Sequence, residues 1–144
     1  MSAVPRDQLL SETVTTRLFG PLTVSPDETV VFPRGLPGFE QNRRFVLLAA
    51  SHKGLYWLQS IDTPELAFML VETVRVSEGA WAQTPGALAI VTLPSGDRPA
   101  TANLRAPVLI DLVAGLGRQA IMADSEFDTA HPFDLASLLG DPAN

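Results

Sequence analysis

The chain has 144 residues, a formal net charge of −6 and no cysteine; 46% of its residues are hydrophobic and 18% are charged. This length suits one domain with one hydrophobic core, and the hydrophobicity argues against a disordered chain. The acidic balance argues against direct nucleic-acid binding, because phosphate contacts require a surplus of cationic side chains. The lack of cysteine removes disulfides, thiolate nucleophiles and cysteine-ligated metals, which agrees with a reducing cytoplasm.

The sequence carries no visible targeting or membrane signal. Its N-terminus lacks the cationic start and apolar run of a secretory signal peptide. No apolar run approaches the roughly 20 residues that span a bilayer. We therefore expect a cytoplasmic protein without a membrane partner. No sustained seven-residue apolar register indicates a dimer seam, so a monomer is expected.

Twelve prolines and ten glycines divide the chain into short segments, many of them rich in β-branched and aromatic residues. Eight such segments predict an all-β fold, a small, mostly antiparallel β-barrel-like domain with a few short helices or turns; a sandwich is the alternative. The expected strands are Glu12–Phe19, Thr29–Phe32, Arg44–Ala50, Leu55–Ile61, Glu65–Val71, Ala87–Leu93, Val108–Val113 and Gln119–Ala123.

One of these strands shows a clear alternation of side chains between two faces. Residues of the run 55–61 divide into an odd-numbered and an even-numbered face. The first holds Leu55, Trp57, Gln59 and Ile61, and the second holds Tyr56, Leu58 and Ser60.

Both ends of the chain are expected to differ from this β domain. Residues 1–12 are predicted to be a flexible segment, because Met1–Leu10 is polar and irregular. Residues 13–132 form the expected β domain. Residues 133–144 form a short helix and an acidic tail, with the helical pattern running over Pro132–Leu139 and stopping at Gly140.

The negative charge is concentrated towards the C-terminus. Arg118 is the last basic residue of the chain. Five acidic residues follow it, namely Asp124, Glu126, Asp128, Asp134 and Asp141. This end of the chain is either an ordinary solvated acidic tail or a surface that attracts a basic partner protein.

The sequence contains no recognisable catalytic, metal or cofactor site. Its two histidines, His52 and His131, are far apart and lack a metal-ligand spacing. No serine has the G-x-S-x-G setting of a nucleophile elbow. Gly115–Ala120 matches the loose dinucleotide pattern G-x-G-x-x-A, but a strand-like run follows it, so we expect a hairpin turn. A small hydrolase or isomerase with a pocket that the sequence does not reveal is the alternative.

The segment Phe32–Glu40 (FPRGLPGFE) is the most distinctive stretch of the chain. Two prolines and two glycines within nine residues fix a compact path. A stiff loop loses little conformational freedom on docking, which suits a binding surface. The other interpretation is a tight connection between strands, with Phe32 and Phe39 turned into the core. The two interpretations are compatible.

Several motifs, taken together and in order, resemble the FliW family of bacterial flagellar assembly factors. They extend over about four fifths of the chain, and their joint order and spacing is more specific than any single motif. The motifs are Thr16–Gly20 (TRLFG), Val31–Glu40 (VFPRGLPGFE), Arg44–Leu48 (RFVLL), Tyr56–Ser60 (YWLQS), Pro64–Phe68 (PELAF), Ile90–Pro94 (IVTLP), Thr101–Pro107 (TANLRAP) and His131–Pro132.

The resemblance implies a small β-barrel-like protein of flagellum biogenesis without catalytic activity, cofactor or metal. Members of this family bind CsrA, an RNA-binding repressor that blocks flagellin translation, and they also bind newly made flagellin, as a chaperone would. The two partners occupy the family's proteins alternately. Export of flagellin then frees the protein to sequester CsrA, which relieves the repression of flagellin synthesis.

Candidate partner-binding residues come from the motifs that carry the resemblance. Apolar anchors are expected to contribute more binding energy than charges at the rim. The apolar candidates are Phe19, Leu36, Phe39, Tyr56 and Phe68. The polar candidates are Glu40, Gln59, Glu65 and Asn103. The alternative is core burial for the apolar residues and, for Asn103, hydrogen bonding within the turn before Pro107.

One segment departs from the family pattern. Family members commonly carry an insert with a Tyr-containing acidic helical stretch between the motifs at Pro64–Phe68 and Ile90–Pro94. Here only Met69–Ala89 intervenes. The acidic helix is therefore expected to be missing or reduced. A FliW-like protein that has kept only one of the two partners is a further alternative.

Overall fold

The protein is described by a computed structural model over residues 11–77, 81, 84, 86–121 and 127–139. In this part of the chain strands dominate, with two short 3₁₀ turns (Pro26–Glu28 and Thr73–Arg75) and the helix α2 (Leu135–Leu139). The strands are β1 (Glu12–Thr16), β2 (Gly20–Val24), β3 (Thr29–Val31), β4 (Arg44–Ala49), β5 (Leu55–Ser60), β6 (Ala67–Glu72), β7 (Leu88–Thr92), β8 (Ala100–Ala102), β9 (Val108–Asp111), β10 (Leu116–Gln119) and β11 (His131–Phe133).

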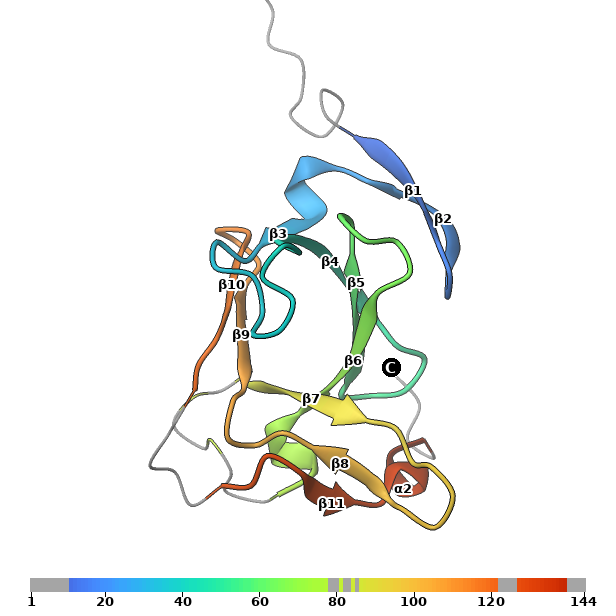
Figure 1. The fold of residues 1–144 in the computed structure, drawn as a ribbon, viewed down its shortest axis with the longest axis vertical. Helices are drawn as coiled ribbons and strands as arrows, with labels where there is room; N and C mark the ends of the chain where they lie inside the picture. The colour runs from blue at the N-terminus through green and yellow to red at the C-terminus, as the bar shows by residue number, and fades with distance from the viewer. Residues whose placement is uncertain (1–10, 78–80, 82–83, 85, 122–126, 140–144) are drawn as a thin grey trace, which may run out of the picture.

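Seven strands close into a barrel in the order β7–β6–β5–β4–β3–β10–β9, and β9 returns to β7 through the pair Leu88–Val108. The pairing is antiparallel throughout except between β10 and β3, which meet in parallel at Leu116 and Val31. Figure 1 shows this ring, with β8, β11 and α2 stacked beyond β7 and the β1–β2 hairpin outside β4 and β5. The predicted all-β, mostly antiparallel barrel is confirmed.

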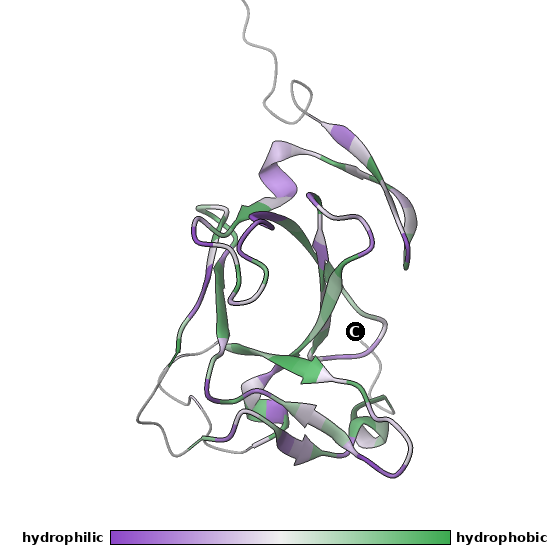
Figure 2. Ribbon diagram, in the orientation of Figure 1, coloured by the Kyte–Doolittle hydropathy of each residue, from purple (hydrophilic) through white to green (hydrophobic). Residues whose placement is uncertain are grey.

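Three clusters of apolar side chains lie on the two faces of the barrel sheet, inside and outside the barrel. The barrel interior holds residues such as Phe32, Phe45 and Leu58. A second cluster, which includes Leu55, lies under β8, β11 and α2, and a third, which includes Ile61, lies under the β1–β2 hairpin. The predicted opposite faces of β5 are therefore confirmed: Leu58 points inward, and Leu55 and Ile61 point outward. In Figure 2 the hydrophobic residues appear as green stretches along the barrel strands β6, β7 and β9.

Some predicted element boundaries are wrong, each for a local reason. The expected strand Gln119–Ala123 is replaced by β10, because Gly115 adopts φ 70° and the chain reverses there. The expected strand Glu12–Phe19 ends at Thr16, whose hydroxyl accepts the Phe19 N–H at 2.9 Å and donates to a carbonyl at 2.9 Å.

Three strands and the helix start also differ from expectation. β2, β8 and β11 were not anticipated, because they are short and β2 and β11 contain proline. The helix expected from Pro132 begins at Leu135, because His131–Phe133 pairs with β8 instead.

The two chain ends are only partly described. Met1–Leu10 and the acidic residues Asp124, Glu126 and Asp141 lie outside the described residues, so the predicted domain boundaries at 12 and 133 stay predictions. Glu12 is already the first residue of β1. None of the described helices has the length and hydropathy needed to cross a bilayer.

The distinctive loop begins at Phe32, whose ring lies directly on the backbone of β10. Phe32 is fully buried, and a Cβ placed on Gly117 would lie only 2.5 Å from its ring. Phe45 stacks edge-on against the same ring at 5.2 Å between centroids. Only a residue without a side chain at position 117 lets the start of the loop pack this closely against β10.

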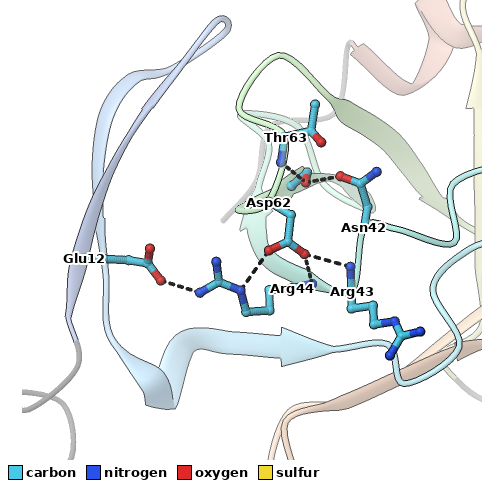
Figure 3. Close-up of polar contacts among 7 residues, drawn as sticks. Glu12, Asn42, Arg43, Arg44, Asp62 and Thr63 are labelled. Atoms are coloured by element: carbon cyan, nitrogen blue, oxygen red, sulfur yellow. Dashed lines mark hydrogen bonds and ion pairs between the residues drawn. The ribbon is translucent and has the colours of Figure 1, made fainter.

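The chain directly after the loop, Asn42–Arg44, is held by the turn after β5, in the cluster drawn in Figure 3. One oxygen of Asp62 accepts the backbone N–H groups of Arg43 and Arg44, both at 2.9 Å. The other oxygen pairs with the Arg44 guanidinium at 2.9 Å, and that guanidinium also pairs with Glu12 of β1 at 2.6 Å. Asn42 accepts the Ser60 hydroxyl at 2.8 Å. We call these contacts the Asp62 clamp.

Replacing Gly117 by alanine is expected to destabilise the protein by about 1–3 kcal/mol, because the new methyl group overlaps the Phe32 ring. Phe32→Leu in the same chain removes the ring and should recover part of this loss. Urea unfolding of the two single variants and the double variant measures the coupling between the positions. Strictly additive losses would contradict the proposed contact.

Replacing Asp62 by alanine is expected to cost about 1–3 kcal/mol at neutral pH, because two backbone N–H groups lose their acceptor. Partial burial alone would raise the pKa of Asp62, but the N–H groups of Arg44 and Arg43 and the Arg44 guanidinium together lower it below 3.8. The carboxylate therefore stabilises the fold above that ordinary value, and the contribution is lost as pH falls through the lower folded pKa. Urea unfolding at about pH 7 and about pH 2 should show the difference from wild type shrinking with acid. An undiminished difference at low pH would contradict this assignment.

Candidate partner-binding surface

The loop Phe32–Glu40 is built from consecutive turns that leave it little freedom. The Gly35 N–H donates to the Phe32 carbonyl at 2.8 Å, and the Phe39 N–H donates to the Leu36 carbonyl at 2.7 Å. Gly35 adopts φ 64°, and a Cβ there would lie 2.6 Å from the Glu40 backbone. The predicted compact path and the predicted burial of Phe32 are both confirmed, whereas the stiffness of the loop stays a prediction. Phe39, in contrast, is 41% exposed.

One hollow beside this loop collects four of the nine predicted binding residues. It has a volume of about 390 Å³, and its lining includes Leu36, Phe39, Phe68 and Asn103. Leu36 is 1% exposed and belongs to the barrel core, so it forms the floor. Phe39 and Phe68 meet edge-on at 5.2 Å between centroids and form an apolar wall. We call this hollow the Phe39 hollow.

Asn103 fills its alternative role as well as lining the hollow. Its side-chain oxygen accepts the Arg105 N–H at 3.2 Å and the Ala106 N–H at 3.1 Å, which fixes the turn after β8. The Arg105 guanidinium, also in the lining, donates to the Phe127 carbonyl at 3.1 Å. The polar rim of the Phe39 hollow is therefore held by hydrogen bonds before any partner arrives.

A second and larger hollow lies between the loop and the strands β9 and β10. It has a volume of about 920 Å³, and Glu40 lines it together with Arg34 and Arg118. The Glu40 carboxylate accepts the Gly38 N–H at 3.0 Å, and this backbone donor, with the N–H of Glu40 itself, lowers its pKa. Pro37, Gln119 and Ile121 line both hollows, so the two share a wall. We call the larger one the β10 groove.

The remaining candidates are not gathered at these hollows. Phe19 stacks edge-on with Trp57 at 5.9 Å, under the β1–β2 hairpin. Glu65 is exposed on the turn between β5 and β6, and Tyr56 is half-buried against the barrel core. Gln59 is 1% exposed and its amide nitrogen donates to three carbonyls, which commits this side chain to the turn after β5 rather than to a partner.

Sequence reasoning missed most of the β10 groove. Arg34 lies inside the distinctive loop but draws no attention there, and Arg118 lies on a strand whose start was misplaced. The only local signal was the glycine pattern Gly115–Ala120. The predicted hairpin turn is confirmed at Gly115, which ends the turn between β9 and β10 with φ 70°, and the rest of the pattern, Leu116–Gln119, is the strand β10 itself.

The departure at Met69–Ala89 is visible in the described part of that segment. It contains most of β6, the 3₁₀ turn Thr73–Arg75 and the first two residues of β7, and its described residues contain no α-helix. Trp81 donates its indole N–H to the Leu104 carbonyl at 2.7 Å. An aromatic side chain here therefore packs onto the turn after β8. Among the described residues, no three or more His, Asp or Glu side chains are grouped so that they could hold a metal ion.

Comparisons with known proteins agree with this architecture. The family model described as FliW protein matches residues 13–79 and 82–133. The flagellar assembly factor FliW of Moorella thermoacetica is 33% identical over 135 residues, covering 82% of this chain and 85% of its own. That of Syntrophotalea carbinolica is 34% identical over 139 residues, covering 85% and 98%. A crystal structure of the flagellar assembly factor FliW superposes with a TM-score of 0.74 at 28% identity, covering 84% and 96%. The chain belongs to the FliW family.

Proposed function

We propose that this protein is a non-enzymatic, cytoplasmic regulator of flagellin production that binds CsrA and flagellin in alternation. Binding of CsrA relieves the repression of flagellin translation, and binding of flagellin releases CsrA. The support for both partners is the resemblance to the FliW family, whose relatives are named flagellar assembly factors. The observation that carries a binding role is the Phe39 hollow, an apolar site with an exposed aromatic wall.

The Phe39 hollow has the features of a protein-docking site. Exposed aromatic side chains in well-packed depressions dominate the energy of many interfaces. The loop that presents Phe39 is fixed by its turns and by the Asp62 clamp, so little conformational entropy is lost when a partner docks. Hydrogen-bonded groups at Asn103 and Arg105 supply the polar rim.

Alternation between two partners requires a negative coupling free energy. If flagellin weakens the binding of CsrA by some factor, CsrA weakens the binding of flagellin by the same factor. Two partners that share the Phe39 hollow would meet this requirement by direct overlap. The hollow and the β10 groove have a common wall at Pro37, Gln119 and Ile121, which would also couple occupants of the two sites.

Replacing Phe39 by serine is expected to weaken binding of CsrA, flagellin or both by about tenfold or more, because an exposed aromatic anchor is lost. Titration calorimetry with each purified partner measures the effect. Leu93→Ser is the matched control, because Leu93 is 50% exposed and outside both hollows. Equal affinities for the two variants would remove the hollow from the interface. Failure of the wild type to bind either protein at micromolar concentration would overturn the proposed function.

The acidic C-terminal charges are expected to accelerate association with a basic repressor. Truncation from Asp134 is a poor test, because Leu135 and Leu138 of α2 pack against the cluster under β8. Replacing the five acidic residues after Arg118 by asparagine or glutamine removes their charges and keeps Leu135 and Leu138 in the chain. Stopped-flow measurements at low salt should show slower CsrA association for the amide variant, and the difference should shrink with added salt. Equal rates at low salt would leave these residues as ordinary solvated chain.

A further inference from the structure

We propose that the β10 groove is a second docking site, which binds a segment of a partner protein that carries apolar side chains flanked by carboxylates. The proposal concerns the chemistry of the bound segment and goes beyond the function proposed above. It does not depend on the Phe39 hollow, with which the groove shares only Pro37, Gln119 and Ile121 of its lining.

The groove offers apolar walls that water would otherwise cover. Its volume is about 920 Å³, within the range of established ligand sites. Leu116 and Ile121 line it and are 48% and 61% exposed. The β9–β10 hairpin continues the apolar surface past the groove, because Leu112 is 63% exposed and Val113 is fully exposed at its tip. Burial of these side chains by a partner would supply hydrophobic free energy.

The charged side chains in the lining differ in whether they already have hydrogen-bond partners within the described part of the chain. The side chains of Arg34 and Arg118 make no hydrogen bond or ion pair to any residue in the described part of the chain. A guanidinium carries five N–H donors and no acceptor, and carboxylates match its fork geometry best.

The two carboxylates of the same lining already have donors within their own turns. Glu40 accepts the Gly38 N–H at 3.0 Å. Asp111 accepts the Val113 and Ala114 N–H groups, both at 3.0 Å. The two guanidinium groups of the lining therefore offer donors to a bound segment, and a segment that carries carboxylates supplies the matching acceptors.

The groove is also rigid on both sides. The Phe32 ring against Gly117 fixes the distance between the loop and β10, and the Asp111 turn fixes the hairpin tip. A site that is already formed loses little entropy when it is filled. The apolar walls and the backbone that frames the groove are thus in place before binding.

Two synthetic fluorescein-labelled peptides of equal length and leucine content test the proposal, one with glutamates and the other with lysines between the leucines. Fluorescence anisotropy of the full chain at low salt should show binding of the glutamate peptide and at least about tenfold weaker binding of the lysine peptide. Arg34→Glu and Arg118→Glu should each weaken the glutamate peptide by about tenfold. Arg98→Glu, an exposed arginine outside the groove, is the matched control and should change nothing.

Several outcomes would overturn the proposal. They are a wild type that does not bind the glutamate peptide, equal binding of the two peptides, and an Arg98→Glu variant that loses as much affinity as Arg118→Glu. Thermal unfolding of each variant confirms that it is folded, and Arg118→Gln, which keeps the polar side chain without the charge, should show an intermediate loss. Intact peptide binding with no binding of CsrA or flagellin would separate this site from the function proposed above.

Discussion

The contact between the Phe32 ring and the bare backbone at Gly117 determines where the distinctive loop lies. It brings the start of the loop onto β10, and the Asp62 clamp secures the far end on β5. Between these two points the turns of the loop leave Leu36 in the core and Phe39 outside. Residues of this loop line both hollows, so the candidate binding surface depends on the packing that places the loop.

Local patterns in the sequence were sufficient for the fold class and for most barrel strands. The alternation in Leu55–Ile61 gave the correct faces, because an antiparallel strand covered on both sides still separates its two sets of side chains. Boundaries failed where side chains outside the pattern decide them. Thr16 ends β1 through its own hydroxyl, and β11 forms because β8 offers a partner far away in sequence.

The candidate site was predictable only in part, for a related reason. Phe39, Phe68 and Asn103 were each identified from separate motifs, and the barrel brings them to one hollow. Their proximity depends on strand order, which sequence periodicity does not contain. Arg34 and Arg118 line the same groove because the loop docks onto β10, and no local sequence pattern indicates this proximity. Gln59 looked available for binding, but three carbonyl contacts bury it.

The proposed function requires that CsrA and flagellin compete for this protein. Calorimetric titration of CsrA into the protein alone and into the protein saturated with flagellin tests that claim directly. We expect flagellin to weaken the apparent affinity for CsrA, and we expect the reciprocal titration to show the same factor. Unchanged affinity for CsrA in the presence of saturating flagellin, with a stable complex of all three proteins, would contradict it.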